Sequence, residues 1–168
     1  MHLFIKFAED VTMQNMGSQI RKIDADKKQF LEFLLLADEQ EDMIDRYLDR
    51  GEMFALYNNE QSVVAVAVVT QESEAVVELK NLAIAPKFQR KGYGRQMVEF
   101  IIHHYSDRYH TLLVGTGDSI QTTSFYKSCG FHYSHTVEEF FTKNYDHPIY
   151  EEGKQLRDML YFSRHIGQ

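Results

Sequence analysis

Residues 89–95 (QRKGYGR) combine two glycines with three cations, a composition suited to holding an anion. Glycine allows tight backbone turns and places no side chain between the main chain and a ligand. The segment follows a strand-like run that ends at Pro86 and opens an amphipathic run that extends to Tyr105. The free N–H groups of a helix's first turn favour phosphate oxygens. The pattern therefore predicts a phosphate-binding turn, although a basic surface turn without a ligand explains the same residues.

Composition and charge restrict the partners that this turn can serve. The chain has 168 residues, enough for one domain with a sizeable core. We place that domain at residues 16–168, with residues 1–15 as a candidate disordered leader. The formal net charge of −7 argues against nucleic acid and anionic membranes as partners. A basic turn in an acidic chain points instead to a small anionic ligand.

Cysteine content and hydropathy bear on the compartment. The single cysteine, Cys129, excludes an internal disulfide and favours a reducing compartment, so we expect a cytoplasmic protein. We interpret Cys129 as a small buried residue at a helix end rather than as a nucleophile. No apolar run approaches the roughly 18 residues that are needed to span a bilayer.

Hydrophobic periodicity predicts a mixed α/β sheet of six or seven strands in a single domain. The order of elements is β-α-α-β-β-β-α-β-α-β-β, with one crossover that begins at the glycine turn. The expected strands are residues 19–23, 52–57, 62–71, 75–85, 112–114, 131–138 and 155–165. The expected helices are residues 24–37, 41–50 and 120–128, with a fourth from the glycine turn to residue 105. Residues 145–153 are expected to form a connecting loop.

A second motif follows the glycine turn by some thirty residues. Residues 125–131 (FYKSCGF) fit an aromatic-Tyr-x-x-x-Gly-Phe pattern, and residues 89–94 fit Q/R-x-x-G-x-G/A. Together they make the chain resemble the GNAT superfamily of acetyl-CoA-dependent N-acetyltransferases. The resemblance covers residues 76–105 and 117–131, and the order of elements over residues 19–165 agrees with it.

The resemblance implies a position for acetyl-CoA between two splayed parallel strands, here residues 78–85 and 112–116. The pantetheine arm is expected to bond to the strand backbone like an added strand, beside a bulge that creates the splay. Many family members carry Asn where this chain has Ser119, so this position departs from the family pattern. The residues implied in cofactor binding are Leu82, Ala83, Ile84, Gln89, Arg90, Lys91, Gly92, Tyr93, Gly94, Arg95, Ser119 and Tyr126.

The same resemblance implies two catalytic residues. An alkylamine has a pKa near 10.4, so only about one molecule in 10³ is neutral at pH 7, and a general base is useful. Glu78 stands four residues before Leu82, where related enzymes often carry a catalytic glutamate. Tyr126 matches the family's general acid, which protonates the CoA thiolate. The alternative readings are a solvated strand residue for Glu78 and a buried aromatic with a satisfied hydroxyl for Tyr126.

Acidic residues between positions 38 and 52 suggest the acceptor. They form either a solvated helix face or a funnel for a cationic amine. We favour a small primary amine as acceptor; the alternatives are a protein or peptide amine, or a non-catalytic acyl-CoA-binding module. Homodimerisation is a tendency of the family. The acidic residues are Asp38, Glu39, Glu41, Asp42, Asp45, Asp49 and Glu52, and the funnel interpretation extends to Glu138, Glu139, Glu151 and Glu152.

Eight histidines do not suggest a metal site. His103 and His104 are adjacent on a predicted helix and point about 100° apart. His132 and His135 fall on opposite faces of a predicted strand. Because neither pair has metal-ligand spacing with a Cys or carboxylate partner, we expect no metal cofactor.

Overall fold

A seven-stranded mixed sheet organises the computed structural model, which describes residues 17–168. Among the described strands, β4 and β5 form the one parallel pair, and the other neighbours are antiparallel. The predicted fold class is confirmed, whereas the predicted leader at residues 1–15 lies outside the described residues. In spatial order the strands are β1 (Gln19–Ile23), β2 (Glu52–Tyr57), β3 (Val63–Gln71), β4 (Val76–Ile84), β5 (Thr111–Gly117), β9 (Met159–His165) and β6 (His132–Val137).

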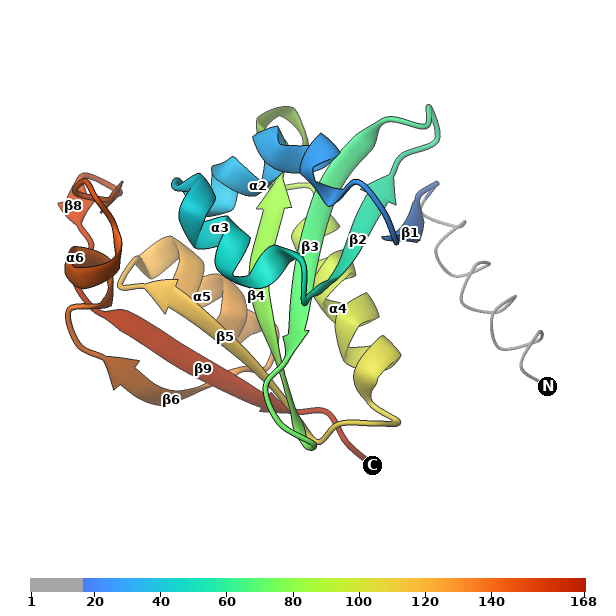
Figure 1. The fold of residues 1–168 in the computed structure, drawn as a ribbon. Helices are drawn as coiled ribbons and strands as arrows, with labels where there is room; N and C mark the ends of the chain where they lie inside the picture. The colour runs from blue at the N-terminus through green and yellow to red at the C-terminus, as the bar shows by residue number, and fades with distance from the viewer. Residues whose placement is uncertain (1–16) are drawn as a thin grey trace.

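Helices cover both faces of the sheet (Figure 1). One face carries α2 (Leu31–Ala37) and α3 (Glu41–Leu48), and the other carries α4 (Tyr93–Tyr105) and α5 (Ile120–Ser128). Two short 3-10 helices, η1 (Lys27–Phe30) and η2 (Pro86–Phe88), precede α2 and α4. None of the helices in residues 17–168 is long and apolar enough to cross a membrane.

Strand β3 is apolar on both faces because it lies between two cores. Val66 and Val68 pack with α2 and α3, whereas Ala65 and Ala67 pack with α4. These side chains are fully buried. A strand that is covered on both faces reads as a continuous apolar run, which is how its central place could be predicted.

Four segments differ from the prediction. The helix expected at residues 24–37 is divided, because Asp26 adopts a left-handed conformation (φ 51°) and η1 precedes α2. The expected loop at residues 145–153 contains β7 (Tyr150–Glu151), which pairs with β8 (Lys154–Gln155) in a small hairpin. The expected last strand, residues 155–165, therefore begins only at Met159. Helix α6 (Phe140–Asn144) was not predicted.

The sheet opens between β4 and β5. The two strands pair only from Val76 with Thr111 to Leu79 with Val114. Beyond this point β4 continues to Ile84 on β3, and β5 continues to Gly117 on β9, so their facing edges separate. The predicted splayed parallel pair is therefore confirmed, and Figure 1 shows the two strands diverging.

A bulge in β4 lies at the start of this opening. Val68 is paired with Asn81 and Val69 with Leu79, so Lys80 is an extra residue without a partner on β3. Leu79 and Leu82 both pack against the core under α4. Asn81 points to the opposite face, where it bonds to α2 and α3.

Candidate functional site

The glycine turn has the geometry of an anion cradle. Gly92 adopts a φ of +90°, and the first hydrogen bond of α4 runs from Gln96 N–H to the Gly92 carbonyl at 3.0 Å. The amides of the residues between them lie in the first helical turn, where N–H groups lack helical acceptors. A Cβ on Gly94 would lie 3.3 Å from Phe125, so a small residue keeps α4 close to α5.

Beside this turn lies the outer channel, an open cavity of about 790 Å³ bounded by the end of α2, β4, residues 88–95 and α5. Lys91 and Tyr93 do not line it. Lys91 places its ammonium 5.8 Å from the Phe88 ring centroid, and the Tyr93 ring lies 6.1 Å from the same ring. The predicted cofactor residues that do line the channel are Leu82, Ala83, Ile84, Gln89, Arg90, Gly92, Gly94, Arg95 and Tyr126.

Two long polar side chains of the turn are already engaged by the protein. Arg95 donates to the carbonyl and hydroxyl of Ser128 at 3.1 and 2.8 Å. Gln89 donates its side-chain amide to the Ile84 carbonyl at 3.1 Å. These bonds fix the turn against α5 and β4, which leaves the main chain as the part of the turn shaped for a ligand.

Ser119 has a structural role at the start of α5. Its side chain accepts a bond from Thr122 N–H at 3.4 Å and caps the helix. The residue is buried and lines neither the outer channel nor the cavity beyond it. Like Lys91 and Tyr93, Ser119 therefore lines neither cavity, although its partner Thr122 lines both.

A second cavity, the inner cavity, continues from the outer channel into the opening of the sheet. Its volume is about 340 Å³, and it is bounded by the end of α2, β4, β5, α5 and residues 141–159. The two cavities share Leu36, Ala37, Leu82, Thr122 and Tyr126. Tyr126 therefore lies where the channel meets the inner cavity.

Tyr126 is held by aromatic neighbours. The residue is 7% exposed, and its ring makes edge contacts with Phe125 and Phe131 at centroid distances of 5.0 and 5.6 Å. Burial raises the pKa of its hydroxyl, and the nearby acidic groups of Cys129 and Glu151 act in the same direction. The phenol is therefore protonated at neutral pH, and its raised pKa makes it a weaker proton donor than an exposed tyrosine.

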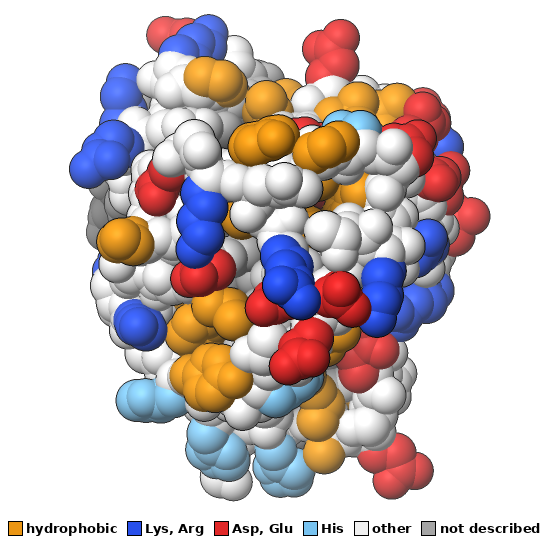
Figure 2. Space-filling view, turned by 90° about the vertical axis from the view of Figure 1, so that its left-hand side faces the viewer, with side chains coloured by type: hydrophobic (Ala, Val, Ile, Leu, Met, Phe, Trp, Pro, Cys, Tyr) orange, Lys and Arg blue, Asp and Glu red, His pale blue; other side chains and the backbone are white. Residues whose placement is uncertain are grey.

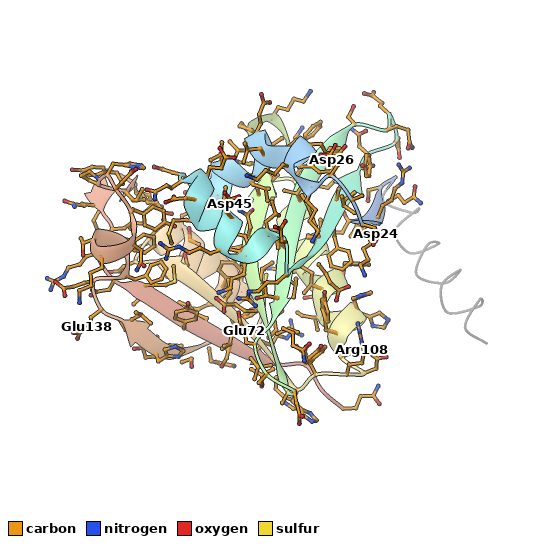
Figure 3. All side chains as sticks on the ribbon, viewed as in Figure 1. Asp24, Asp26, Asp45, Glu72, Arg108 and Glu138 are labelled. Atoms are coloured by element: carbon orange, nitrogen blue, oxygen red, sulfur yellow. The ribbon has the colours of Figure 1, made fainter. Side chains whose placement is uncertain are left out.

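Glu78 has a different environment from Tyr126. It is 6% exposed, and its carboxylate lies 3.0 Å from the ammonium of Lys80. Burial raises the pKa of Glu78, while Lys80 lowers it and neighbouring Glu72 raises it. Lys80 also reaches Glu72 at 3.5 Å, and Figure 3 labels Glu72 beside the end of β3. Lys80 lines the inner cavity, but Glu78 does not.

A polar network borders the inner cavity through Asp38, Asn81 and Tyr145. Asp38 accepts bonds from the hydroxyls of Tyr145 at 2.7 Å and Tyr47 at 3.2 Å. The side-chain amide of Asn81 donates to Tyr47 Oη and to the Leu34 carbonyl, both at 3.0 Å. Burial raises the pKa of Asp38. The network joins α2, α3, β4 and the residue that follows α6.

Comparisons with known proteins agree with this geometry. A family model described as an acetyltransferase (GNAT) domain matches residues 49–133. The chain is 36% identical over 131 residues to the uncharacterized N-acetyltransferase YvbK of Bacillus subtilis, covering 77% of this chain and 84% of that protein.

The chain belongs to the GNAT acetyltransferase family.

Solved GNAT structures extend the likeness to the whole domain. An acetyltransferase from Elizabethkingia anophelis with acetyl-CoA bound is 30% identical, with a TM-score of 0.83 over 89% of this chain and 98% of that chain. A Bacillus subtilis acetyltransferase in complex with CoA is 32% identical, with a TM-score of 0.81 over 88% and 98%. These two relatives bind acetyl-CoA and CoA, respectively.

Most of the acidic residues near the first helices lie away from the inner cavity of this GNAT domain. Of the seven, only Asp38 and Glu39 line it. Lys28 pairs with Glu41 and with Asp45, which Figure 3 labels on α3, both at 2.8 Å. Fewer acidic residues therefore line the cavity than the sequence suggested.

Sequence reasoning missed one polar residue of the cavity wall, Asn81, and the residue behind it, Tyr47, which bonds to Asn81 and Asp38 without lining the cavity. An asparagine within an apolar strand is uncommon, and that was the available signal for Asn81. Within residues 17–168 no group of three or more potential metal ligands comes together. Cys129 is buried, and burial raises the pKa of its thiol.

Proposed function

We propose that this acetyltransferase moves an acetyl group from acetyl-CoA to the primary amino group of a small cationic molecule. The inner cavity carries the proposal, because its volume suits a small molecule and it adjoins Tyr126. Its acidic lining residues are Asp38, Glu39 and Glu151, against the single cation Lys80, which is already paired with carboxylates. Such a lining favours a positively charged guest.

The unpaired edge of β4 supports the position of the cosubstrate. Leu82, Ala83 and Ile84 line the outer channel, and the β5 edge does not pair with them. Their backbone can accept an extended pantetheine arm as an added strand, while the glycine turn receives the diphosphate. A backbone N–H of this segment would also stabilise the oxyanion that develops at the thioester.

Two side chains are proposed to move protons. Tyr126 donates its proton to the departing CoA thiolate, as its place between the two cavities supports. Glu78 is proposed as the base that receives the proton of the amine. Because Glu78 does not line the inner cavity, this transfer would pass through water beside Lys80.

A peptide amine is the second candidate acceptor. Three large apolar side chains, Leu36, Ile120 and Tyr150, are 51%, 78% and 56% exposed. Leu36 lines both cavities, and the other two precede residues that line one of them. An exposed apolar rim of this kind suits a peptide as well as the apolar part of a small amine.

The deciding experiment is a free-thiol release assay with acetyl-CoA. The panel would contain butylamine, 1,4-diaminobutane, phenethylamine, lysine methyl ester and short peptides with free N-termini. We expect release with the small amines. Release with peptides alone would favour the second candidate. Coenzyme A binding without release for any amine would instead favour a non-catalytic acyl-CoA-binding module.

Compartment and assembly are proposed more broadly. The lone buried cysteine fits a reducing compartment, in accord with a cytoplasmic enzyme. Homodimerisation stays a prediction, and sedimentation of the purified protein would test it.

A further inference from the structure

The amide of Asn81 has a fixed orientation. Its Nδ2 faces the Leu34 carbonyl, which can only accept a bond. It also faces Tyr47 Oη, whose own proton is donated to Asp38. Both neighbours therefore require Nδ2 on the side of the Asn81 amide that faces Leu34 and Tyr47. Oδ1 must then lie on the side that is turned away from them. Oδ1 is buried in a residue that is 3% exposed, and it has no hydrogen-bond partner among the described residues.

Glu151 carries a second oxygen of this kind. The residue lies on β7, and its Oε2 is buried without a hydrogen-bond partner among residues 17–168. Leaving a buried acceptor unsatisfied costs roughly 1–3 kcal/mol, and more for a charged group. Asn81 and Glu151 are far apart in the sequence, yet both line the inner cavity.

We propose that Asn81 Oδ1 and Glu151 Oε2 together bind the ammonium group of the acceptor. Both atoms only accept hydrogen bonds when Glu151 is ionised, so the guest that satisfies them must donate. An ammonium brings three donors and a positive charge that balances the carboxylate. This assignment rests on the proposed N-acetyltransferase function and names the residues that select the acceptor.

The charged groups around Glu151 are consistent with this role. Glu39 after α2 and Glu152 on the same hairpin raise its pKa, as burial does most strongly, whereas a hydrogen bond with Ser119 lowers it. Tyr126 on α5 is the neighbouring phenol. The hairpin's own cation, Lys154, is paired with Asp118 at 2.8 Å.

The test compares Glu151→Gln with Glu152→Gln. Glu152 is exposed and does not line the inner cavity, so it is a matched control one residue away. The probe is the amine of the panel with the highest kcat/KM. We expect Glu151→Gln to raise KM for that amine about tenfold or more, because it removes a charged hydrogen-bond acceptor. The affinity for CoA and the Tm should not change. Glu152→Gln should leave KM within about twofold.

The pH dependence provides a second readout. Glu151 binds the ammonium only as a carboxylate, and burial raises its pKa. The KM for the amine should therefore rise as the pH falls through a value above the ordinary glutamate pKa. This acidic rise should be absent in Glu151→Gln.

A third variant, Asn81→Ser, tests the other oxygen. It should also raise the amine KM, with calorimetric titration of CoA as the check that the variant is folded. An unchanged amine KM in Glu151→Gln, with normal acetylation by the parent, would overturn this assignment alone. Absence of thiol release by the parent with every amine would instead overturn the proposed function.

Discussion

Tyr126 and Glu78 illustrate how one resemblance places two residues in different surroundings. Both are buried, and burial raises the pKa of each. Tyr126 lines both cavities, whereas Glu78 lines neither and is paired with Lys80. The two proposed proton-transfer roles therefore need separate tests.

Replacement of Tyr126 by Phe removes only the hydroxyl. We expect turnover to fall about tenfold or more, within the usual range for general acid catalysis. The affinity for acetyl-CoA should be nearly unchanged, because the ring contacts with Phe125 and Phe131 remain. Steady-state kinetics and calorimetry with CoA measure the two quantities. Unchanged turnover would refute the acid role.

Replacement of Glu78 by Gln tests the base. A base must be ionised, so kcat of the parent should decline as the pH falls through the raised pKa of Glu78. The variant should lose this acidic limb, and its plateau should be lower by roughly 10²-fold. A pH profile of kcat identical to that of the parent would exclude Glu78 from proton transfer and leave it as the partner of Lys80.

At the scale of elements, the glycine turn depends on one unusual backbone angle. Gly92→Ala places a side chain at φ +90°, where strain costs on the order of 1–3 kcal/mol, although a Cβ there meets no atom within 4 Å. We expect weaker CoA binding as the turn adjusts. Gly153→Ala is the control, since Gly153 has φ +75° and equally open space. If calorimetry shows equal losses of CoA affinity in both variants, the turn has no special role.

Long, regular elements could be predicted from sequence, and short or irregular ones could not. Strand β2 and helix α5 have the predicted bounds, because glycines and polar turn residues flank them. The hairpin of β7 and β8 has two residues per strand, too few for a period of two to be recognised. Glu151 lies in this hairpin, so its placement in the inner cavity required the structure.

The candidate site shows the same division. The glycine turn and Tyr126 each belong to a short sequence motif, and such motifs can be recognised without the structure. Asn81, Tyr47 and Asp38 form their network across three elements, which only tertiary packing brings together. Sequence alone could not show that Lys91 and Tyr93 turn toward Phe88 instead of the channel.

At the scale of the molecule, hydrogen bonds join the end of α6 to α3 and to the residue that follows α2. Tyr145 donates to Asp38, and Arg46 donates to Asn144 at 3.1 Å. Figure 2 shows the side of the molecule that contains α6, where basic and acidic side chains lie next to one another. That face has no uniform charge, so the proposed selection of a cationic acceptor rests on the groups that line the inner cavity.

Tyr145→Phe tests the hydrogen bond to Asp38. Loss of the hydroxyl removes one donor from a buried carboxylate, and we expect a decrease of about 1–3 kcal/mol in the free energy of unfolding. Tyr150→Phe is the control, because Tyr150 is 56% exposed. Urea denaturation measures both. Equal stability of the two variants would mean that the Tyr145 bond does not hold the segment.

The single unmatched residue at position 80 sets two properties of the enzyme together. It separates the half of β4 that pairs with β5 from the half that lines the outer channel, and it shifts the alternation of side chains in the second half by one residue. If Lys80 paired regularly with β3, Asn81 would turn toward the core under α4 and Leu82 toward α2 and α3. Loss of the bulge would therefore reverse every later side chain of β4 at once, whereas a substitution changes the cavity wall one side chain at a time.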